Sequence, residues 1–201
     1  LSVLGNFKDI NYESELNKTL HYYTAEQYRI YSETLLKEAE QKNDNLSWGL
    51  YVFFSIAFYM GMRKGEIHAL RWSDIEGNVF HIRHSISQKL KGGDRVTAPK
   101  NKSSIRDIIA PKQLMDILQV HKERWKKFTA FSEDLYVCGG PASLRDTTIE
   151  NMNKHISEIT GLPHIRIHDF RHPYVKHTTK NFVFPYALKS CILYAISMRL
   201  S

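Results

Sequence analysis

Residues 24–42 repeat their apolar positions with the period of an α-helix. The recurring apolar positions are Tyr28, Tyr31, Leu35 and Ala39. Such a spacing on an otherwise polar stretch is typical of an amphipathic helix with one buried stripe. Thr24 begins the stretch and Gln27 follows three positions later, which predicts a capping box at the helix start. The pattern fades in the polar run 42–45, where we expect the helix to end.

The next segment, residues 47–60, is apolar on nearly every face. A helix that is apolar all round is expected to be buried, so we predict that this one forms the centre of the fold. Ser47 is the expected N-cap. Gly61 interrupts the pattern, and a short third helix is predicted from about Arg63 to Leu70.

A β-rich stretch follows. Gly77-Asn78 marks a turn, after which Phe80 and Ile82 alternate with polar residues. Gly92-Gly93-Asp94 is a second turn signal. Short strands are expected over residues 95–98 and 105–109, with Pro99 to Ser104 as the tip between them.

The last part of the chain is predicted to be helical again. Pro111 is expected to open one helix, and Thr147 or Thr148 to cap another that ends at Gly161. A further helix is expected near His168. Helices, a small antiparallel sheet and more helices define an α+β fold that is mostly helical. Residues 1–20 lack a sustained period and are interpreted as a linker, which leaves 21–201 as one domain.

Charge changes this picture because it is unevenly distributed. The chain carries a net charge of +7, and no acidic residue follows Asp169. A polyanionic partner and a mixed, solvated surface explain the total charge about equally well. The central basic segment favours the polyanion, and its residues are Arg83, Lys89, Lys91, Arg95, Lys100, Lys102 and Arg106.

Other function classes are disfavoured by composition. Cys138 and Cys191 are too few and too far apart for a disulfide framework or a paired-cysteine zinc site, which favours a reducing compartment. The longest apolar run, residues 50–60, is too short to cross a bilayer. The chain begins with Leu1, which suggests a fragment of a longer protein.

The most informative motif is GMRKGEIHALRWSD, residues 61–74. Spacing alone favours an exposed pair of Arg63 with Glu66, worth only about 0.3–0.5 kcal/mol. The whole string, however, resembles the first signature of the tyrosine recombinases, the phage-integrase class of DNA strand-exchange enzymes. The resemblance implies that Arg63 contacts the scissile phosphate and that Glu66 supports it.

Two further motifs resemble the same family. TAPKNKSSIR, residues 97–106, is similar to a β-hairpin whose tip lysine protonates the departing 5′ oxygen; Lys100 takes that position, with Lys102 as its rival. HDFRH, residues 168–172, resembles the second box. There the resemblance makes His168 a proton-transfer or positioning group, Arg171 a second phosphate clamp, and His172 a supporting residue.

The resemblance implies a site-specific recombinase that breaks and rejoins DNA through a 3′-phosphotyrosyl intermediate, during integration or excision of a phage or mobile element. It implies double-stranded DNA as the partner and neither cofactor nor metal. The full-length protein would carry an additional N-terminal DNA-binding region and act as a homotetramer on DNA. Such a protein is expected in the cytoplasm, encoded by a bacterium or phage, without a membrane partner.

The nucleophile is where the sequence departs from the family pattern. A tyrosine is expected a little over thirty residues after Arg171, preceded by Gly-His or Gly-Trp, but only thirty residues follow and neither pair occurs. Tyr186 and Tyr194 are candidates without supporting neighbours. We expect an atypical tail from about residue 173, out of frame or rearranged.

Two alternatives remain from the sequence. A catalytically silent DNA-binding module would retain the clamp without the nucleophile. A zinc hydrolase would use His168 and His172, which lie four residues apart on one helical face. Arg171 beside them would repel a cation, which disfavours this second alternative.

Overall fold

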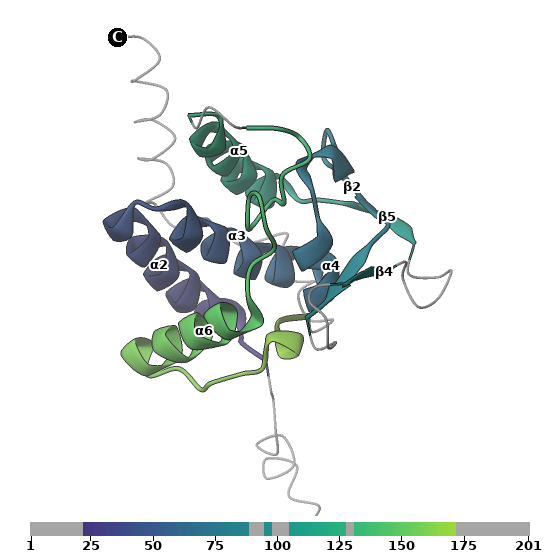
Figure 1. Cartoon of the computed structure of the whole chain (residues 1–201). Helices are drawn as coiled ribbons and strands as arrows, with labels where there is room; N and C mark the ends of the chain where they lie inside the picture. Colours follow the sequence, from purple (N-terminus) through teal and green to yellow (C-terminus); the bar gives the residue numbers. More distant parts are fainter. Residues whose placement is uncertain (1–21, 89–94, 98–104, 128–130, 172–201) are drawn as a thin grey trace, which may run out of the picture.

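The computed structural model describes residues 22–88, 95–97, 105–127 and 131–171. Its helices and strands follow the predicted order, so the α+β class is confirmed (Figure 1). The helical elements are α2 (Ala25–Lys42), α3 (Asn45–Met60), α4 (Lys64–Ala69), η1 (Trp72–Asp74), α5 (Lys112–Lys126), α6 (Asp146–Thr160) and η3 (Ile167–Arg171). The strands are β1 (Ile75–Glu76), β2 (Val79–Ile82), β3 (Ser85–Ser87), β4 (Arg95–Thr97) and β5 (Arg106–Ile109).

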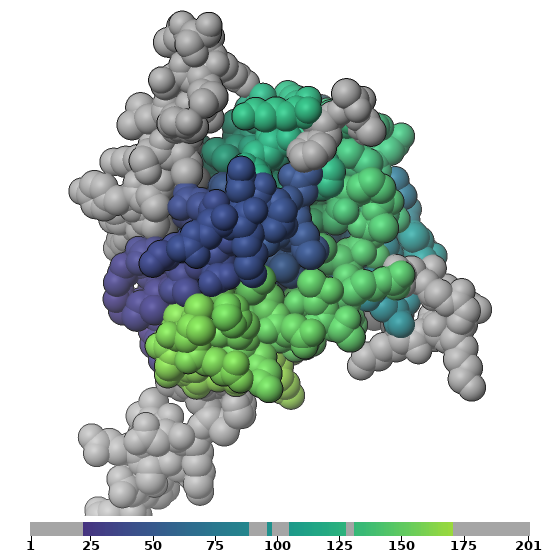
Figure 2. Space-filling model, turned by 60° about the vertical axis from the view of Figure 1, so that its left-hand side comes forward, coloured from purple at the N-terminus to yellow at the C-terminus, as the bar shows by residue number. Residues whose placement is uncertain are grey.

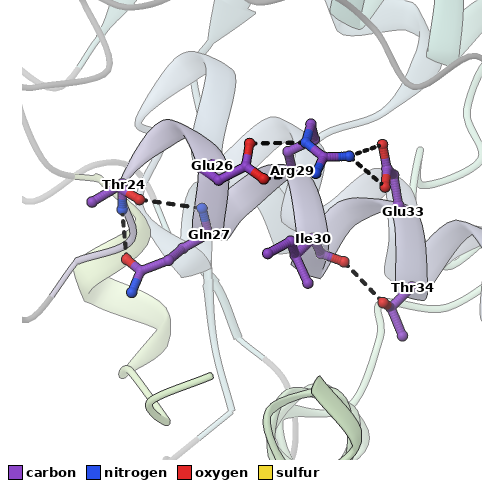
Figure 3. Close-up of polar contacts among 7 residues, drawn as sticks. All are labelled: Thr24, Glu26, Gln27, Arg29, Ile30, Glu33 and Thr34. Carbon is purple, nitrogen blue, oxygen red and sulfur yellow. Dashed lines mark hydrogen bonds and ion pairs between the residues drawn. The ribbon is translucent and has the colours of Figure 1, made fainter. Parts of the chain in front are cut away.

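Helix α2 begins with the predicted capping box. Thr24 Oγ1 accepts a hydrogen bond from the Gln27 amide at 3.2 Å, and the Thr24 amide donates to Gln27 Oε1 at 2.9 Å (Figure 3). The helix ends at Lys42, and Asn43 follows in the left-handed region with a φ of 50°. The apolar stripe of α2 is buried against α3 and α6, and Figure 2 shows the green-to-yellow segment lying against the purple one.

Helix α3 is the centre of the fold, as its composition predicted. Every residue from 47 to 58 is buried, and α3 contacts α2, α4, α5 and η3. The predicted cap is wrong, because Asp44 and not Ser47 occupies the N-cap position. The Asp44 carboxylate accepts from the Ser47 amide at 2.7 Å, since Ser47 is the third helical residue, where an orphan N–H needs an acceptor.

The strands form two small antiparallel sheets, in the orders β1-β2-β5 and β3-β4. The two strands expected on either side of Pro99 to Ser104 are present as β4 and β5, but they do not pair with each other as in a hairpin: β4 pairs with β3 and β5 pairs with β2. The expected tip itself lies outside the described residues. This pairing allows Phe80, Ile82 and Ile86 all to be buried, and a shift of register by one residue would expose them.

Two later predictions need correction. Helix α6 starts at Asp146, with Arg145 and neither Thr147 nor Thr148 at the N-cap. The Asp146 amide donates instead to Gln88 Oε1 at 2.8 Å, so a distant side chain takes the role of a local cap. The helix expected near His168 is the 3₁₀ helix η3 in the described residues. Gly161 ends α6 with a φ of 68°, as predicted.

Candidate active site

Arg63 lies at the junction between the buried helix α3 and the short helix α4. Gly61 ends α3 with a φ of 58°, and Arg63 is the extended N-cap residue of α4. The Arg63 amide donates to Glu66 Oε2 at 2.8 Å, and Arg63 Nη1 donates to Glu66 Oε1 at 2.9 Å. One carboxylate therefore fixes both the backbone and the side chain of Arg63.

Glu66 is buried, with a side-chain exposure of only 2%. It is also bound by Arg106, the first residue of β5. Arg106 Nη1 donates to Glu66 Oε1 at 2.9 Å and Arg106 Nη2 donates to Oε2 at 2.8 Å, a bidentate pair. Burial alone would raise the pKa of the Glu66 carboxyl, but the bonds from Arg106 and Arg63 outweigh it and lower that pKa to about 2. Glu66 is therefore fully ionised at neutral pH.

The Arg63 guanidinium is half exposed, with 55% of its side-chain surface accessible. Its hydrogen bond to Glu66 uses Nη1 alone. Among the described residues, Nε and Nη2 have no bonded partner, so the edge of the guanidinium that they form is available to a ligand. That edge carries parallel N–H groups with the geometry that binds two oxygens of a phosphate or carboxylate.

The second motif is anchored by Phe170, whose role the sequence did not reveal. Phe170 is buried, and its ring lies 5.5, 5.4 and 5.2 Å from those of Tyr23, Tyr31 and Phe54. Two residues earlier in η3, His168 is exposed. The only signal in the sequence was an aromatic residue inside a polar motif.

Helix α3 connects the two motifs. Phe53 contacts the ring of His68 in α4 at 5.5 Å, and the adjacent Phe54 contacts Phe170 in η3. Two consecutive core residues thus support the element after Arg63 and the element that carries His168. A packed core of this kind holds its attached elements rigidly.

Asp146 forms a further connection that the sequence did not predict. Its Oδ2 accepts from Lys64 Nζ at 2.7 Å and its Oδ1 bonds His68 Nε2 at 2.9 Å. Partial burial raises the pKa of Asp146, but the bond from Lys64 outweighs it, so the pKa lies below its ordinary value. The start of α6 is thereby attached to α4.

The basic residues predicted to bind DNA lie in different settings. Arg83 Nη2 pairs with Asp107 Oδ1 at 2.6 Å on the sheet, and Arg106 binds Glu66. Arg95 begins β4 and Arg171 ends η3. The other predicted site residues lie outside the described part of the chain: Lys89, Lys91, Lys100, Lys102, His172, Tyr186 and Tyr194.

In the described ranges, no group of three His, Cys, Asp or Glu side chains is placed to hold a metal ion. No helix in those ranges is long and apolar enough to span a membrane.

Comparison with known proteins identifies the family. The sequence model of the Phage integrase family matches residues 29–183, most of the chain. This protein therefore belongs to the phage integrase family, the class that its Arg63 motif resembles. The match includes the first residues of the tail interpreted as atypical and ends before residues 184–201.

Two curated relatives are similar over the same region. The ICEBs1 integrase of Bacillus subtilis (strain 168) is 34% identical over 137 residues, which are 61% of this chain and 35% of the relative. A tyrosine recombinase XerC-like protein of Caldanaerobacter subterraneus subsp. tengcongensis is 28% identical over 145 residues, 62% of this chain and 37% of that protein. The chain thus spans little more than a third of the length of these relatives.

Solved structures share the fold. The Tn1549 transposon integrase in complex with transposon right end DNA superposes with a TM-score of 0.58 at 17% identity, over 85% of this chain and 56% of that one. The XerA recombinase gives a TM-score of 0.50 at 16% identity, over 86% and 57% of the two chains. The fold is therefore that of the tyrosine recombinase catalytic domain.

Proposed function

We propose that this chain is the catalytic domain of a site-specific DNA recombinase that integrates or excises a mobile element. The observation that carries the proposal is the fixed, half-exposed guanidinium of Arg63, whose Nε–Nη2 edge is available to a ligand. A cation held in place before the substrate arrives stabilises charge that develops during reaction at low reorganisation cost. The ICEBs1 integrase and the Tn1549 transposon integrase, both named for mobile elements, support this assignment.

The chemistry follows from phosphoryl transfer. A tyrosine hydroxyl attacks a DNA phosphate, forms a 3′-phosphotyrosyl bond and releases a 5′ hydroxyl, which then attacks the corresponding bond on the partner strand. Negative charge collects on the non-bridging oxygens, and arginines suit them because the guanidinium is planar and always charged. Arg63 is the first such clamp.

The remaining roles rest on the resemblance of the motifs. We assign Arg171 as the second clamp, Lys100 as the general acid for the 5′ oxygen, and His168 as the proton-transfer or positioning group. The exposure of His168 on the anchored helix η3 supports this role. His172 is a supporting residue, and the nucleophile is Tyr186 or Tyr194 if it lies within this chain.

The partner we propose is double-stranded DNA, because the Tn1549 integrase of the same fold was solved with DNA. The basic side chains expected to bind it are Arg83, Lys89, Lys91, Arg95 and Lys102. We further propose that the full-length protein acts as a homotetramer on DNA in a bacterial cytoplasm, and that residues 1–20 link this domain to an N-terminal DNA-binding region.

A covalent trapping assay tests the proposal. The protein is incubated with a pool of duplexes of random sequence that carry a nick at one fixed position. In those members of the pool that are cleaved close to the nick, the short product diffuses away and the protein stays attached to the DNA. We expect a protein–DNA band that survives denaturant and disappears in Arg63→Gln. Tyr186→Phe and Tyr194→Phe then identify the nucleophile by which of them abolishes the band.

The other outcomes are also informative. Salt-sensitive binding without a covalent band would contradict DNA cleavage by this chain and favour the catalytically silent DNA-binding module. A band that persists in both tyrosine variants would refute both nucleophile candidates. Activity that depends on added zinc would favour the hydrolase alternative.

A further inference from the structure

The Arg106–Glu66 pair joins two parts of the fold that are forty residues apart in sequence. Glu66 belongs to α4, which follows the buried helix, whereas Arg106 begins β5, which pairs with β2. Arg106 is mostly covered, with 27% of its side chain exposed. The bond pattern makes Glu66 a bridge, since both of its oxygens bind Arg106 while each also accepts one bond from Arg63.

This arrangement constrains the Arg63 guanidinium. If Glu66 were bonded to Arg63 alone, its carboxylate could still rotate about the Cγ–Cδ bond. The bidentate pair with Arg106 fixes the plane of the Glu66 carboxylate, because both parallel N–H···O bonds break if that plane turns. Fixing the plane of Glu66 fixes the direction in which Oε1 accepts the bond from Arg63 Nη1.

The same arrangement sets the local charge. Arg63 and Glu66 alone would form a neutral pair, which attracts an anion weakly. With Arg106 the three side chains carry a net charge of +1. This excess positive charge is available at Arg63, the most exposed of the three.

We propose that Arg106 is a positioning residue: through the buried Glu66 carboxylate it orients the Arg63 guanidinium and keeps the cluster positively charged, without contacting DNA itself. The inference rests on the proposed function, in which Arg63 binds a DNA phosphate. It changes the role expected for Arg106 from the sequence, where the residue belonged to a basic segment facing DNA.

A double-mutant cycle tests this role. The dissociation constant for a fluorescent 30-base-pair duplex is measured for the wild type, Arg63→Gln, Arg106→Gln and the double variant at one low salt concentration. Each single change is expected to weaken binding roughly tenfold, as for the loss of one good phosphate contact. In the Arg63→Gln background, Arg106→Gln is expected to weaken binding much less than tenfold, because only the loss of one charge remains when there is no Arg63 guanidinium to orient.

Additive effects in this cycle would overturn the proposal, because they would show that Arg106 contacts DNA independently. Lys112→Gln is the matched control, since Lys112 is an exposed cation on α5 that pairs with Asp116. Its duplex affinity is expected to equal that of the wild type. Arg106→Lys keeps the charge but lacks the fork, so it should restore only part of the affinity.

An NMR measurement on the free protein tests the positioning separately from DNA binding. The Nε–H signal of Arg63, assigned by its loss in Arg63→Gln, reports the motion of the guanidinium. Arg106→Lys and Arg106→Gln are expected to lower its order parameter, while Lys112→Gln leaves it unchanged. An unchanged Arg63 signal in the Arg106 variants overturns the positioning role. If Arg63→Gln binds DNA like the wild type while Arg106→Gln mobilises Arg63, the proposed function fails and the positioning role stands.

Discussion

Glu66 carries a full negative charge although its side chain is almost completely buried. Burial of a charge is costly, and Glu66 remains ionised because two arginines and a backbone N–H donate to it. The cost is therefore offset only while all of these donors stay in place. The two bonds that Arg63 donates to Glu66 are therefore part of what stabilises this buried charge.

Glu66→Gln should lower the free energy of unfolding by roughly 1–3 kcal/mol at pH 7, because the bonds from Arg106 and Arg63 that hold the pKa of this carboxyl at about 2 stabilise its charged form. Because the pKa of Glu66 is lowered in the folded state, this stabilisation is complete above about pH 4.5 and is lost as the pH falls toward 2. Urea unfolding of both proteins at several pH values checks this. The difference between them should shrink across that window.

Glu33→Gln is the matched control for this experiment. Glu33 is partly exposed and pairs with Arg29 on the surface of α2 (Figure 3). Exposed pairs contribute about 0.3–0.5 kcal/mol, so this variant should unfold nearly like the wild type. A Glu66→Gln protein as stable as Glu33→Gln would show that the buried cluster does not stabilise the fold.

At the residue scale, the sequence predicted Arg63 and Glu66 as partners because they belong to one short motif. It did not predict Arg106 as the third member. The contact between β5 and α4 depends on which strands pair, and sequence spacing does not fix that. Phe170 and Asp146 were missed for the same reason, since their partners lie far away along the chain.

At the element scale, helix α4 lies against β3 at a distance that only glycine permits. A Cβ atom added at Gly65 would lie 2.7 Å from the backbone oxygen of Ile86 and 2.5 Å from Ser85 Oγ. The backbone oxygen cannot move without shifting the strand. The lack of a side chain at Gly65 therefore lets α4 pack directly against β3.

Gly65→Ala should lower the free energy of unfolding by about 1–3 kcal/mol, the usual cost of overpacking. It should also weaken DNA binding, because α4 carries Glu66. Chemical denaturation and duplex titration check the two effects. His84→Ala, at an exposed position beside β3, should alter stability by no more than about 0.5 kcal/mol. Equal stability of the two variants would contradict the close packing.

His121 connects α5 to the segment that follows it. Its Nε2 donates to the carbonyl oxygen of Val137 at 2.8 Å inside the core. Burial lowers the pKa of His121 from 6.5 to about 4, because the charged form is poorly solvated there. The folded state therefore holds His121 neutral at pH values where the unfolded chain binds a proton.

His121, like Glu66, should therefore make the fold less stable in acid, but for a different reason: the folded state favours the neutral form of His121 and the charged form of Glu66. The stability contributed by neutral His121 is complete above about pH 6.5 and declines as pH falls toward 4. In His121→Gln, which keeps an N–H donor without titrating, the unfolding free energy should fall less over this range. Thermal unfolding at pH 4.5 and 7 measures the difference. Parallel pH profiles would contradict a buried neutral His121.

The positions of α2 and α3 were predicted well because their hydrophobic patterns extend over many residues. The pairing of the strands was not predicted correctly, because β3, β4 and β5 have only three or four residues each. Such strands carry too little alternation to specify their neighbours. Two predicted helix caps were wrong. At the start of α3 the acceptor for the free N–H is Asp44, one turn before the predicted Ser47, and at the start of α6 it is the distant side chain of Gln88.

At the scale of the whole molecule, both motifs are supported by one helix. Helix α3 contacts α4 and η3 directly, and neighbouring residues Phe53 and Phe54 make the aromatic contacts. The family and fold were predictable because the motifs occur in order along the chain. Their convergence on α3 was not, since a helix that is buried on every face does not reveal its individual partners.

The most direct test of the central claim, that Arg63 is a phosphate clamp of a DNA recombinase, is duplex binding measured by fluorescence anisotropy over a range of salt concentrations. We predict that affinity falls steeply as salt rises. Arg63→Ala should bind more weakly and reduce the slope of log affinity against log salt by about one unit, as for one lost phosphate contact. Lys112→Ala should match the wild type. Affinity independent of salt, or an Arg63→Ala protein that binds like the wild type, would contradict the account.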